Sequence, residues 1–142
     1  MTKGMVATAS TTIHAPVSSV WDALVDPKKI KQYMFGTDVK SDFKEGSPIT
    51  WKGEWKGMPY EDKGIIQRTT PNRLLQYTHF SPMGGLPDKP ENYHTVAIEL
   101  LGNDGETKVK LSQDNNANEE AREESEKNWS MMLEGLKKLL EQ

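Results

Sequence analysis

The residues of this sequence best suited to chemistry are aromatic side chains whose spacing places them on shared faces. Trp51, Tyr77 and His79 occupy predicted inward positions of strands, where residues alternate between two faces. Wide rings with a phenol and an imidazole among them form a surface that can bind and orient a flat apolar molecule. A buried tyrosine or histidine also needs a hydrogen-bond partner, which a ligand can supply. We therefore predict an apolar ligand site with these walls: Tyr33, Phe43, Trp51, Trp55, Tyr77, His79, Trp129 and Met132.

The alternative for the same side chains is that they fill the interior of a small protein. Several wide rings and two polar heads on one face pack less tightly than leucine and valine would, and this favours a pocket.

Two adjacent carboxylates are weaker candidates, for proton transfer. Glu61 and Asp62 follow the predicted hairpin turn at residues 57–60, between Lys56 and Lys63. Opposite charges side by side are typical of a solvated cluster, and we interpret them so. No catalytic residue is assigned from these carboxylates.

An enzyme that used the aromatic face would need a general acid or base there. Tyr77 and His79 could polarise a carbonyl, and in that case we expect them to be hydrogen-bonded to each other or to a shared water. The sequence has no GxSxG motif and no phosphate-binding glycine loop, since Gly84-Gly85 lies between prolines. A binding module is therefore favoured over an enzyme.

Metal and thiol chemistry find no support in the sequence. There is no Cys, and His14, His79 and His94 lie in three separate segments without a pair at i, i+4 spacing. We predict neither a metal nor another cofactor. His14 follows a predicted strand and is expected to be exposed, whereas His94 lies where the chain enters a strand and could approach the mouth of a cavity.

One long segment has a helical period, from about Asn118 to Glu141. Its apolar residues recur at steps of three and four, so they form one stripe on a helix about 35 Å long. The stripe passes from small residues through Trp129 and Met132 to leucine. It indicates either a helix that simply covers the core or one whose Trp and Met portion also roofs a ligand cavity, and what lies opposite decides between them.

The rest of the chain predicts strands, with two short helices after the first. Residues 5–14 alternate as a β-branched strand, and residues 16–24 and 30–34 have helical spacing. Residues 37–115 alternate with a period of two between regular turns, which indicates about six antiparallel strands. Their apolar face needs a cover that only the last helix is long enough to supply. The predicted inward residues are Val39, Phe43, Ile49, Trp51, Trp55, Leu75, Tyr77, His79, Val96, Ile98, Leu100, Val109, Leu111 and Gln113.

A long loop separates two of these strands, from Ser81 to Asn92. Long loops on a rigid scaffold are often gates over a binding site. A gate over the cavity and an ordinary flexible crossing are both consistent with this segment.

Composition predicts a globular chain of one domain, residues 1–142. The net charge is −3, from 18 Lys and Arg against 21 Asp and Glu, without a basic run longer than a pair, so nucleic acid is not an expected partner. No segment has the length and apolarity of a membrane span or a signal peptide. We expect a cytoplasmic protein that is a monomer or a weak homodimer.

Three stretches resemble a known family: VWDALVDPKKIKQYMFGTDVKSDFKEGSPITWKGEWKGMPYEDKG (20–64), PNRLLQYTHFS (71–81) and NWSMMLEGLKKLLE (128–141). In this order they are similar to the activator of heat-shock-protein-90 ATPase-like family, within the START-like, helix-grip superfamily of polyketide cyclases and lipid-transfer domains. The resemblance implies a cavity between sheet and helix, and it implies no shared reaction. It also implies a chaperone as an alternative partner, although the chain shows no counterpart of the chaperone-docking domain of the eukaryotic co-chaperones.

These observations predict an α+β helix-grip fold. We expect a curved antiparallel sheet of about seven strands, two short helices after strand one, and a long C-terminal helix packed on the concave face. The predicted function is the binding of an apolar or aromatic small molecule between sheet and helix. The first alternative is a heat-shock co-chaperone-like interaction protein with a solid core, and the second is a cyclase- or hydrolase-like enzyme that uses the same cavity.

Overall fold

The computed structural model describes residues 4–55, 57–82, 85–103 and 105–141, and of Trp55 it describes only the backbone. The elements follow the predicted order of one strand, two helices, six strands and a long final helix. Their bounds are β1 Met5–Ile13, α1 Val17–Val25, α2 Pro27–Tyr33, β2 Asp38–Lys40, β3 Pro48–Trp55, β4 Met58–Thr70, β5 Leu74–His79, the 3-10 helix η2 Pro90–Asn92, β6 His94–Gly102, β7 Thr107–Asn116 and α3 Glu119–Leu140.

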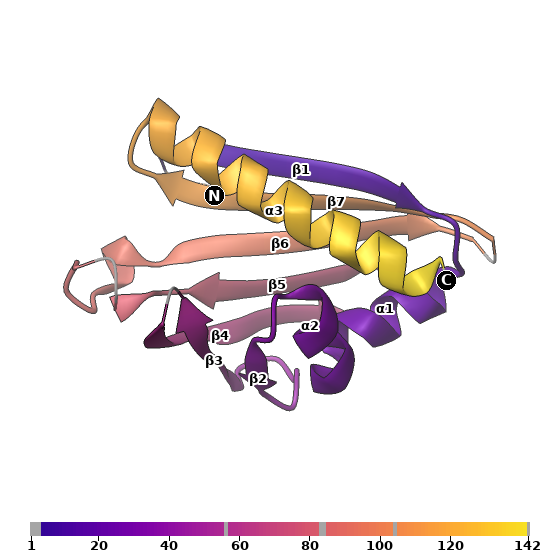
Figure 1. The fold of residues 1–142 in the computed structure, drawn as a ribbon, viewed down its shortest axis with the longest axis horizontal. Helices are drawn as coiled ribbons and strands as arrows, with labels where there is room; N and C mark the ends of the chain where they lie inside the picture. Colours follow the sequence, from indigo (N-terminus) through magenta and orange to yellow (C-terminus); the bar gives the residue numbers. More distant parts are fainter. Residues whose placement is uncertain (1–3, 56, 83–84, 104, 142) are drawn as a thin grey trace.

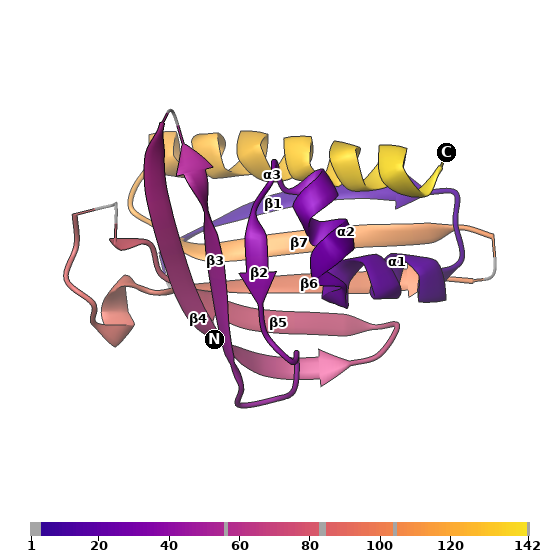
Figure 2. The ribbon, with the colours of Figure 1, turned by 60° about the horizontal axis from the view of Figure 1, so that its bottom comes forward.

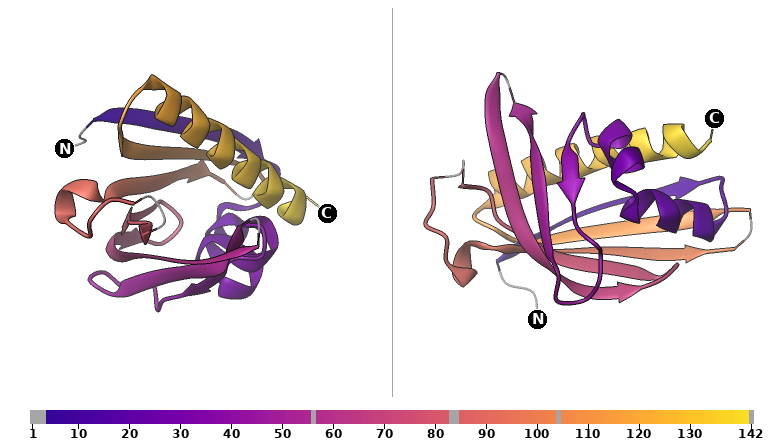
Figure 3. Two further views of the ribbon diagram at one scale, coloured as in Figure 1. Left: turned by 60° about the vertical axis from the view of Figure 1, so that its left-hand side comes forward. Right: turned by 90° about the horizontal axis from the view of Figure 1, so that it is seen from below.

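The seven strands form one sheet in the order β1-β7-β6-β5-β4-β3-β2, with every neighbouring pair antiparallel. Strands β2 to β7 are a meander, and β1 pairs with the last of them. Figure 1 shows α3 lying across the sheet, and the left view of Figure 3 shows the sheet curved around it, with β1 and β7 on one side and β2 to β4 on the other. The predicted helix-grip fold is confirmed.

The core lies between the concave face of the sheet and the helices. Most of the predicted inward strand residues are buried, because only one face of the sheet packs against other elements. They are Val39, Phe43, Ile49, Trp51, Leu75, Tyr77, Val96, Ile98, Leu100, Val109, Leu111 and Gln113. The helices contribute Val20, Ala23, Leu24, Ile30, Tyr33, Met132, Leu133 and Leu136.

Helices α2 and α3 begin at residues whose side chains cap them. The Asn118 side chain accepts a hydrogen bond of 2.8 Å from the Ala121 amide at the start of α3, and Asp26 accepts one of 3.0 Å from Lys28 at the start of α2. Helix α3 packs most closely along β1, and α1 and α2 lie near its C-terminal half (Figure 2). Within the described ranges, no helix is long and apolar enough to cross a membrane.

Strand β1 is an edge of the sheet, and side chains of α3 bond to its outer backbone groups. Such unpaired groups otherwise attract strands of other chains. The three bonds run from the Thr8 amide to Glu126, from the His14 amide to Glu141 and from the Lys137 ammonium to the Thr12 carbonyl, at 3.0, 2.8 and 2.6 Å. They fasten α3 to β1 from the middle of the strand to the residue after its end.

These bonds make the stability of the fold depend on pH. The hydrogen bond from the Thr8 amide lowers the pKa of Glu126 below its ordinary 4.5, and the bond from the His14 amide lowers the pKa of Glu141 likewise. A carboxylate with a lowered folded pKa stabilises the protein above its unfolded pKa, and this contribution is lost as the pH falls through the folded pKa. We therefore expect stability to fall below about pH 4.5.

The variant Glu126→Gln/Glu141→Gln tests this dependence in urea unfolding between about pH 7 and about pH 3. It should be less stable than the wild type at neutral pH, and the difference should narrow as the pH falls. Glu123→Gln/Glu124→Gln is the matched control, because both residues are exposed on the same helix. A difference that stays constant over the whole pH range would contradict the role of the two carboxylates.

Candidate functional site

An aromatic and polar cluster lies on the concave face, where β5 ends and β6 begins. The Trp51 ring centroid is 5.2 Å from that of Tyr77 and 5.0 Å from that of His79, and His94 stacks on His79 at 6.2 Å. The register pairs Trp51 with Asp62 and His79 with His94, so four neighbouring strands each contribute to one row. We call these five residues, Trp51, Asp62, Tyr77, His79 and His94, the concave cluster.

A hydrogen bond between Asp62 and His79 forms the polar part of the concave cluster. His79 Nε2 lies 2.9 Å from Asp62 Oδ2, and the imidazole donates because a carboxylate oxygen only accepts. The two side chains are mostly buried, with 15% of Asp62 and 28% of His79 exposed. Asp62 Oδ1 is buried and has no hydrogen-bond partner among the described residues. One carboxylate oxygen of Asp62 thus has no donor from the described residues.

The prediction that Glu61 and Asp62 belong to one solvated cluster is wrong for Asp62. Alternate residues of β4 face opposite sides of the sheet, so Glu61 and Lys63 are exposed while Asp62 is turned inward. Lys63 forms an ion pair with Asp88 instead. Lys56 lies outside the described residues.

Counting from the hairpin turn would have identified Asp62. The turn after Trp55 pairs that residue with Met58, and each step back along β3 then matches one step forward along β4. Four such steps pair the inward Trp51 with Asp62. The charged neighbours of Asp62 concealed this signal, because β4 has few large apolar residues to mark its inward face.

Two further polar groups of the concave cluster are His94 and Tyr77. His94 Nδ1 lies 2.9 Å from the Asp114 carbonyl oxygen, so Nδ1 carries the proton and Nε2 of the neutral ring is an acceptor. Burial raises the pKa of the Tyr77 phenol, which stays a neutral hydroxyl at ordinary pH. The partner of His79 is Asp62 and not Tyr77, unlike the arrangement expected for an enzyme. His14, as predicted, is exposed.

Trp129 and Met132 approach the sheet from α3. Trp129 is partly buried, and its Nε1 donates to Gln113 Oε1 on β7 at 2.5 Å, whereas Met132 is 3% exposed and belongs to the core. Gln113 pairs with Val96, and Val96 pairs with Tyr77. The contact of Trp129 with the sheet is therefore two strands away from Tyr77 and one strand away from β6, which carries His94.

Tyr33 and Phe43 lie in the core, apart from the concave cluster. The Tyr33 hydroxyl donates to the Ala23 carbonyl at 2.9 Å and joins α2 to α1. The Phe43 carbonyl accepts from Thr69 Oγ1, and this contact is about 20 Å along β4 from the concave cluster. The predicted role of the Trp55 side chain lies outside the described part of the structure.

The loop from Ser81 to Asn92 is fastened to the convex face. Its Asp88 pairs with Lys63 and accepts a 2.6 Å hydrogen bond from the Tyr93 hydroxyl. Tyr93 stacks on Phe80 with centroids 5.0 Å apart. Lys63 and Phe80 occupy the opposite parity to Asp62 and His79, so these contacts hold the loop on the side away from the concave cluster.

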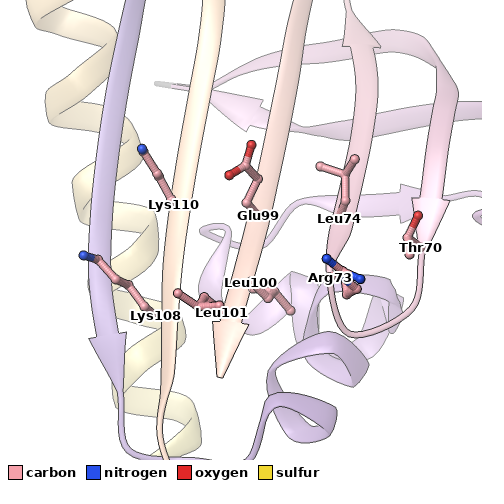
Figure 4. Close-up of a pocket in the computed structure, with 8 residues that line it drawn as sticks. All are labelled: Thr70, Arg73, Leu74, Glu99, Leu100, Leu101, Lys108 and Lys110. Carbon is pink, nitrogen blue, oxygen red and sulfur yellow. The ribbon is translucent and has the colours of Figure 1, made fainter. Parts of the chain in front are cut away.

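An open pocket lies on the convex face, by the turn between β4 and β5. Figure 4 shows the pocket by this turn, and its lysine, arginine and glutamate side chains lie on the face of the sheet away from α3, whereas Leu100 also belongs to the core. Leu101, one of the residues that line it, is 77% exposed. The lining is Thr70, Arg73, Leu74, Glu99, Leu100, Leu101, Lys108 and Lys110. None of the residues predicted for the ligand site lines this pocket.

Comparison with known proteins gives a family and a fold. The family described as "Activator of Hsp90 ATPase homolog 1-like protein" matches residues 14–141. The solution structure of ChR145 from Cytophaga hutchinsonii is 55% identical, with a TM-score of 0.85, covering 99% of this chain and 96% of that one. No curated protein matches the sequence significantly.

Two more distant structures share the fold. The solution structure of the Aha1 dimer from Colwellia psychrerythraea is 18% identical, with a TM-score of 0.72 and 96% of each chain covered. The crystal structure of CalU16 from Micromonospora echinospora is 22% identical, with a TM-score of 0.71, covering 97% of this chain and 83% of that one. At this identity the likeness concerns the fold alone.

Proposed function

Because the chain belongs to the family of proteins similar to the activator of Hsp90 ATPase homolog 1, we propose that it binds an apolar or aromatic small molecule between the sheet and α3. The observation that carries the proposal is the concave cluster. It combines aromatic rings with a buried carboxylate oxygen, Asp62 Oδ1, that no described residue satisfies. A closed core avoids such a group, whereas a ligand site uses a few polar groups among apolar walls.

The two walls of the proposed site come from the concave cluster and from the first half of α3. Helix α3 packs closest on β1, and its buried residues all lie in its second half. The first half presents Trp129, which is only partly buried, toward the concave face. In this proposal Trp51, Tyr77, His79 and Trp129 touch the ligand. Trp55 remains a predicted wall residue, and Tyr33, Phe43 and Met132 support the site from the core.

One observation favours the enzyme as a second candidate. His79 is held by a carboxylate, which is the arrangement that orients an imidazole for general acid or base work. Such an enzyme would need the concave cluster to hold its substrate, so binding is the first property to test. The co-chaperone alternative is supported by the family relationship alone.

Native mass spectrometry of protein purified from its source tests the proposal, followed by extraction and identification of any bound compound. We expect a co-purifying small molecule. In Trp129→Ala its affinity should fall by about tenfold or more, because an aromatic wall in a desolvated site contributes roughly 1.5 kcal/mol or more. Far-ultraviolet circular dichroism should show that the variant keeps its fold.

Trp21→Ala is the matched control. Trp21 is also a partly buried tryptophan on a helix, but it packs on the core from α1, away from the concave cluster. The control should retain the ligand. A protein that carries no compound and ignores a panel of apolar and aromatic molecules would overturn the proposal, and capture of a chaperone by this empty protein would favour the interaction alternative.

A further inference from the structure

The polar groups that the concave cluster offers to a ligand are mostly acceptors. Asp62 Oδ1 has no donor among the described residues. His79 Nε2 and His94 Nδ1 are donors already in use, and the second nitrogen of an imidazole in its neutral form offers a lone pair. The donors in the concave cluster without a hydrogen bond to the described residues are the Tyr77 hydroxyl and the Trp51 indole N–H.

We infer that the ligand carries a hydroxyl or N–H group that donates to Asp62 Oδ1 while its apolar body lies against Trp51. This inference rests on the proposed function and specifies the chemistry of the ligand. A buried acceptor without a donor is costly, and hydrogen bonds to charged groups are about twice as strong as neutral ones. A donor on the ligand therefore satisfies the carboxylate and contributes strongly to affinity.

The arrangement of Trp51 and Asp62 fits a flat ligand with its donor at the ring edge. The two residues are directly opposite on neighbouring antiparallel strands, where Cβ atoms are about 5 Å apart. A ring stacked on the indole thus brings a substituent on its edge to the carboxylate. The Asp62–His79 bond fixes the carboxylate in this position, because Oδ2 is already occupied.

The same chemistry disfavours aromatic or aliphatic acids as ligands. A carboxylate on the ligand would have no donor to offer and would be repelled by Asp62 across a mostly buried site. The structure thus predicts a preference for alcohols, phenols or N–H compounds over acids and ethers of the same shape.

Three probes of equal ring size test the preference: 2-naphthol, 2-methoxynaphthalene and 2-naphthoate. Binding is measured by isothermal titration calorimetry and by amide chemical shifts of the full chain. In the wild type, 2-naphthol should bind at least about tenfold more tightly than 2-methoxynaphthalene, and 2-naphthoate should bind most weakly.

Asp62→Asn replaces the carboxylate by an amide of the same shape that can also donate. The variant should lose the preference for 2-naphthol and should bind 2-naphthoate about tenfold more tightly than the wild type does. A gain of binding cannot result from a damaged fold. Glu61→Gln is the matched control, because Glu61 is the adjacent residue on β4 but is exposed on the other side, and it should leave all three affinities unchanged.

The outcomes separate this inference from the proposed function. Equal affinities of the wild type for 2-naphthol and 2-methoxynaphthalene would overturn the role of Asp62 and leave the ligand site in place. Unchanged 2-naphthoate binding in Asp62→Asn would also overturn it. If none of the three probes binds at any concentration up to its solubility limit, the ligand site itself is refuted, and the inference is refuted with it.

Discussion

Gly64→Ala is expected to lower the free energy of unfolding by about 3 kcal/mol or more, because it forces a side chain into a backbone contact. A Cβ atom at Gly64 would stand 1.7 Å from the Thr78 carbonyl oxygen and 2.6 Å from its carbonyl carbon. Both atoms belong to the main chain of β5, so the two strands would have to separate. Gly64 is buried, and no solvent-side rearrangement relieves the clash.

The close approach at Gly64 also positions the concave cluster. Lys63 pairs with Phe80 on one side of it, and the Ile65 amide donates to Thr78 Oγ1 at 2.9 Å on the other. This approach of β4 to β5 brings Asp62 to His79. Separation of the strands should therefore lengthen or break the Asp62–His79 hydrogen bond as well as destabilise the fold.

Urea unfolding measures the stability of Gly64→Ala, and the nitrogen-15 shifts of the His79 ring report its hydrogen bond. Gly105→Ala is the matched control, because the nearest described atom beyond its chain neighbours that a Cβ there would meet is Asn103 Oδ1, at an ordinary 3.8 Å. The control should unfold within about 0.5 kcal/mol of the wild type. A cost below about 1 kcal/mol for Gly64→Ala would show that β4 and β5 can part without loss and would contradict the argument.

The fold could be predicted from the sequence because two hydrophobic patterns in it are clear: the two-residue alternation of the strands and the 3.6-residue repeat of the last helix. One buried face of the sheet makes each strand alternate, and the stripe on the last helix matches that face in length. Family resemblance then supplied the order in which the sheet wraps the helix. The hydrogen bonds from the backbone of β1 to Glu126 and Glu141 could not be predicted. In the sequence these two residues look like any other surface glutamates, and only the structure shows that they accept from the Thr8 and His14 amides.

The candidate site was predicted less completely than the fold. Trp51, Tyr77 and His79 come together as expected, because their strand parity was correct. Asp62 was assigned to the surface, since the sequence shows its charged neighbours and not its cross-strand partner. The alternation of residues shows which face of the sheet a side chain occupies, but it does not show how far along the sheet that side chain lies. For this reason Phe43 was predicted near the site, whereas the structure places it beside Thr69, away from the concave cluster.

Leu136→Ala is expected to lower the free energy of unfolding by about 3 kcal/mol, through lost burial and the cavity that remains. Leu136 has 0% of its surface exposed, at the point where α3 passes α2 and the sheet. The neighbouring Gly135 allows this close packing, because a Cβ there would come within 3.3 Å of the Tyr33 carbonyl oxygen. Neighbours held this tightly cannot collapse into the space that a leucine leaves.

Leu140→Ala is the graded control for this prediction, since Leu140 belongs to the same stripe but is only partly buried at the end of α3. In urea unfolding, Leu140→Ala should lower the free energy of unfolding by about 1 kcal/mol or less.

An equal loss of stability in the two variants would show that the apolar residues of α3 contribute evenly along its second half. A large difference would place the main apolar anchor of α3 in the middle of its second half, away from Trp129. In that case Leu136→Ala should keep the order of affinities for the three naphthalene probes even as the protein unfolds at lower urea concentration.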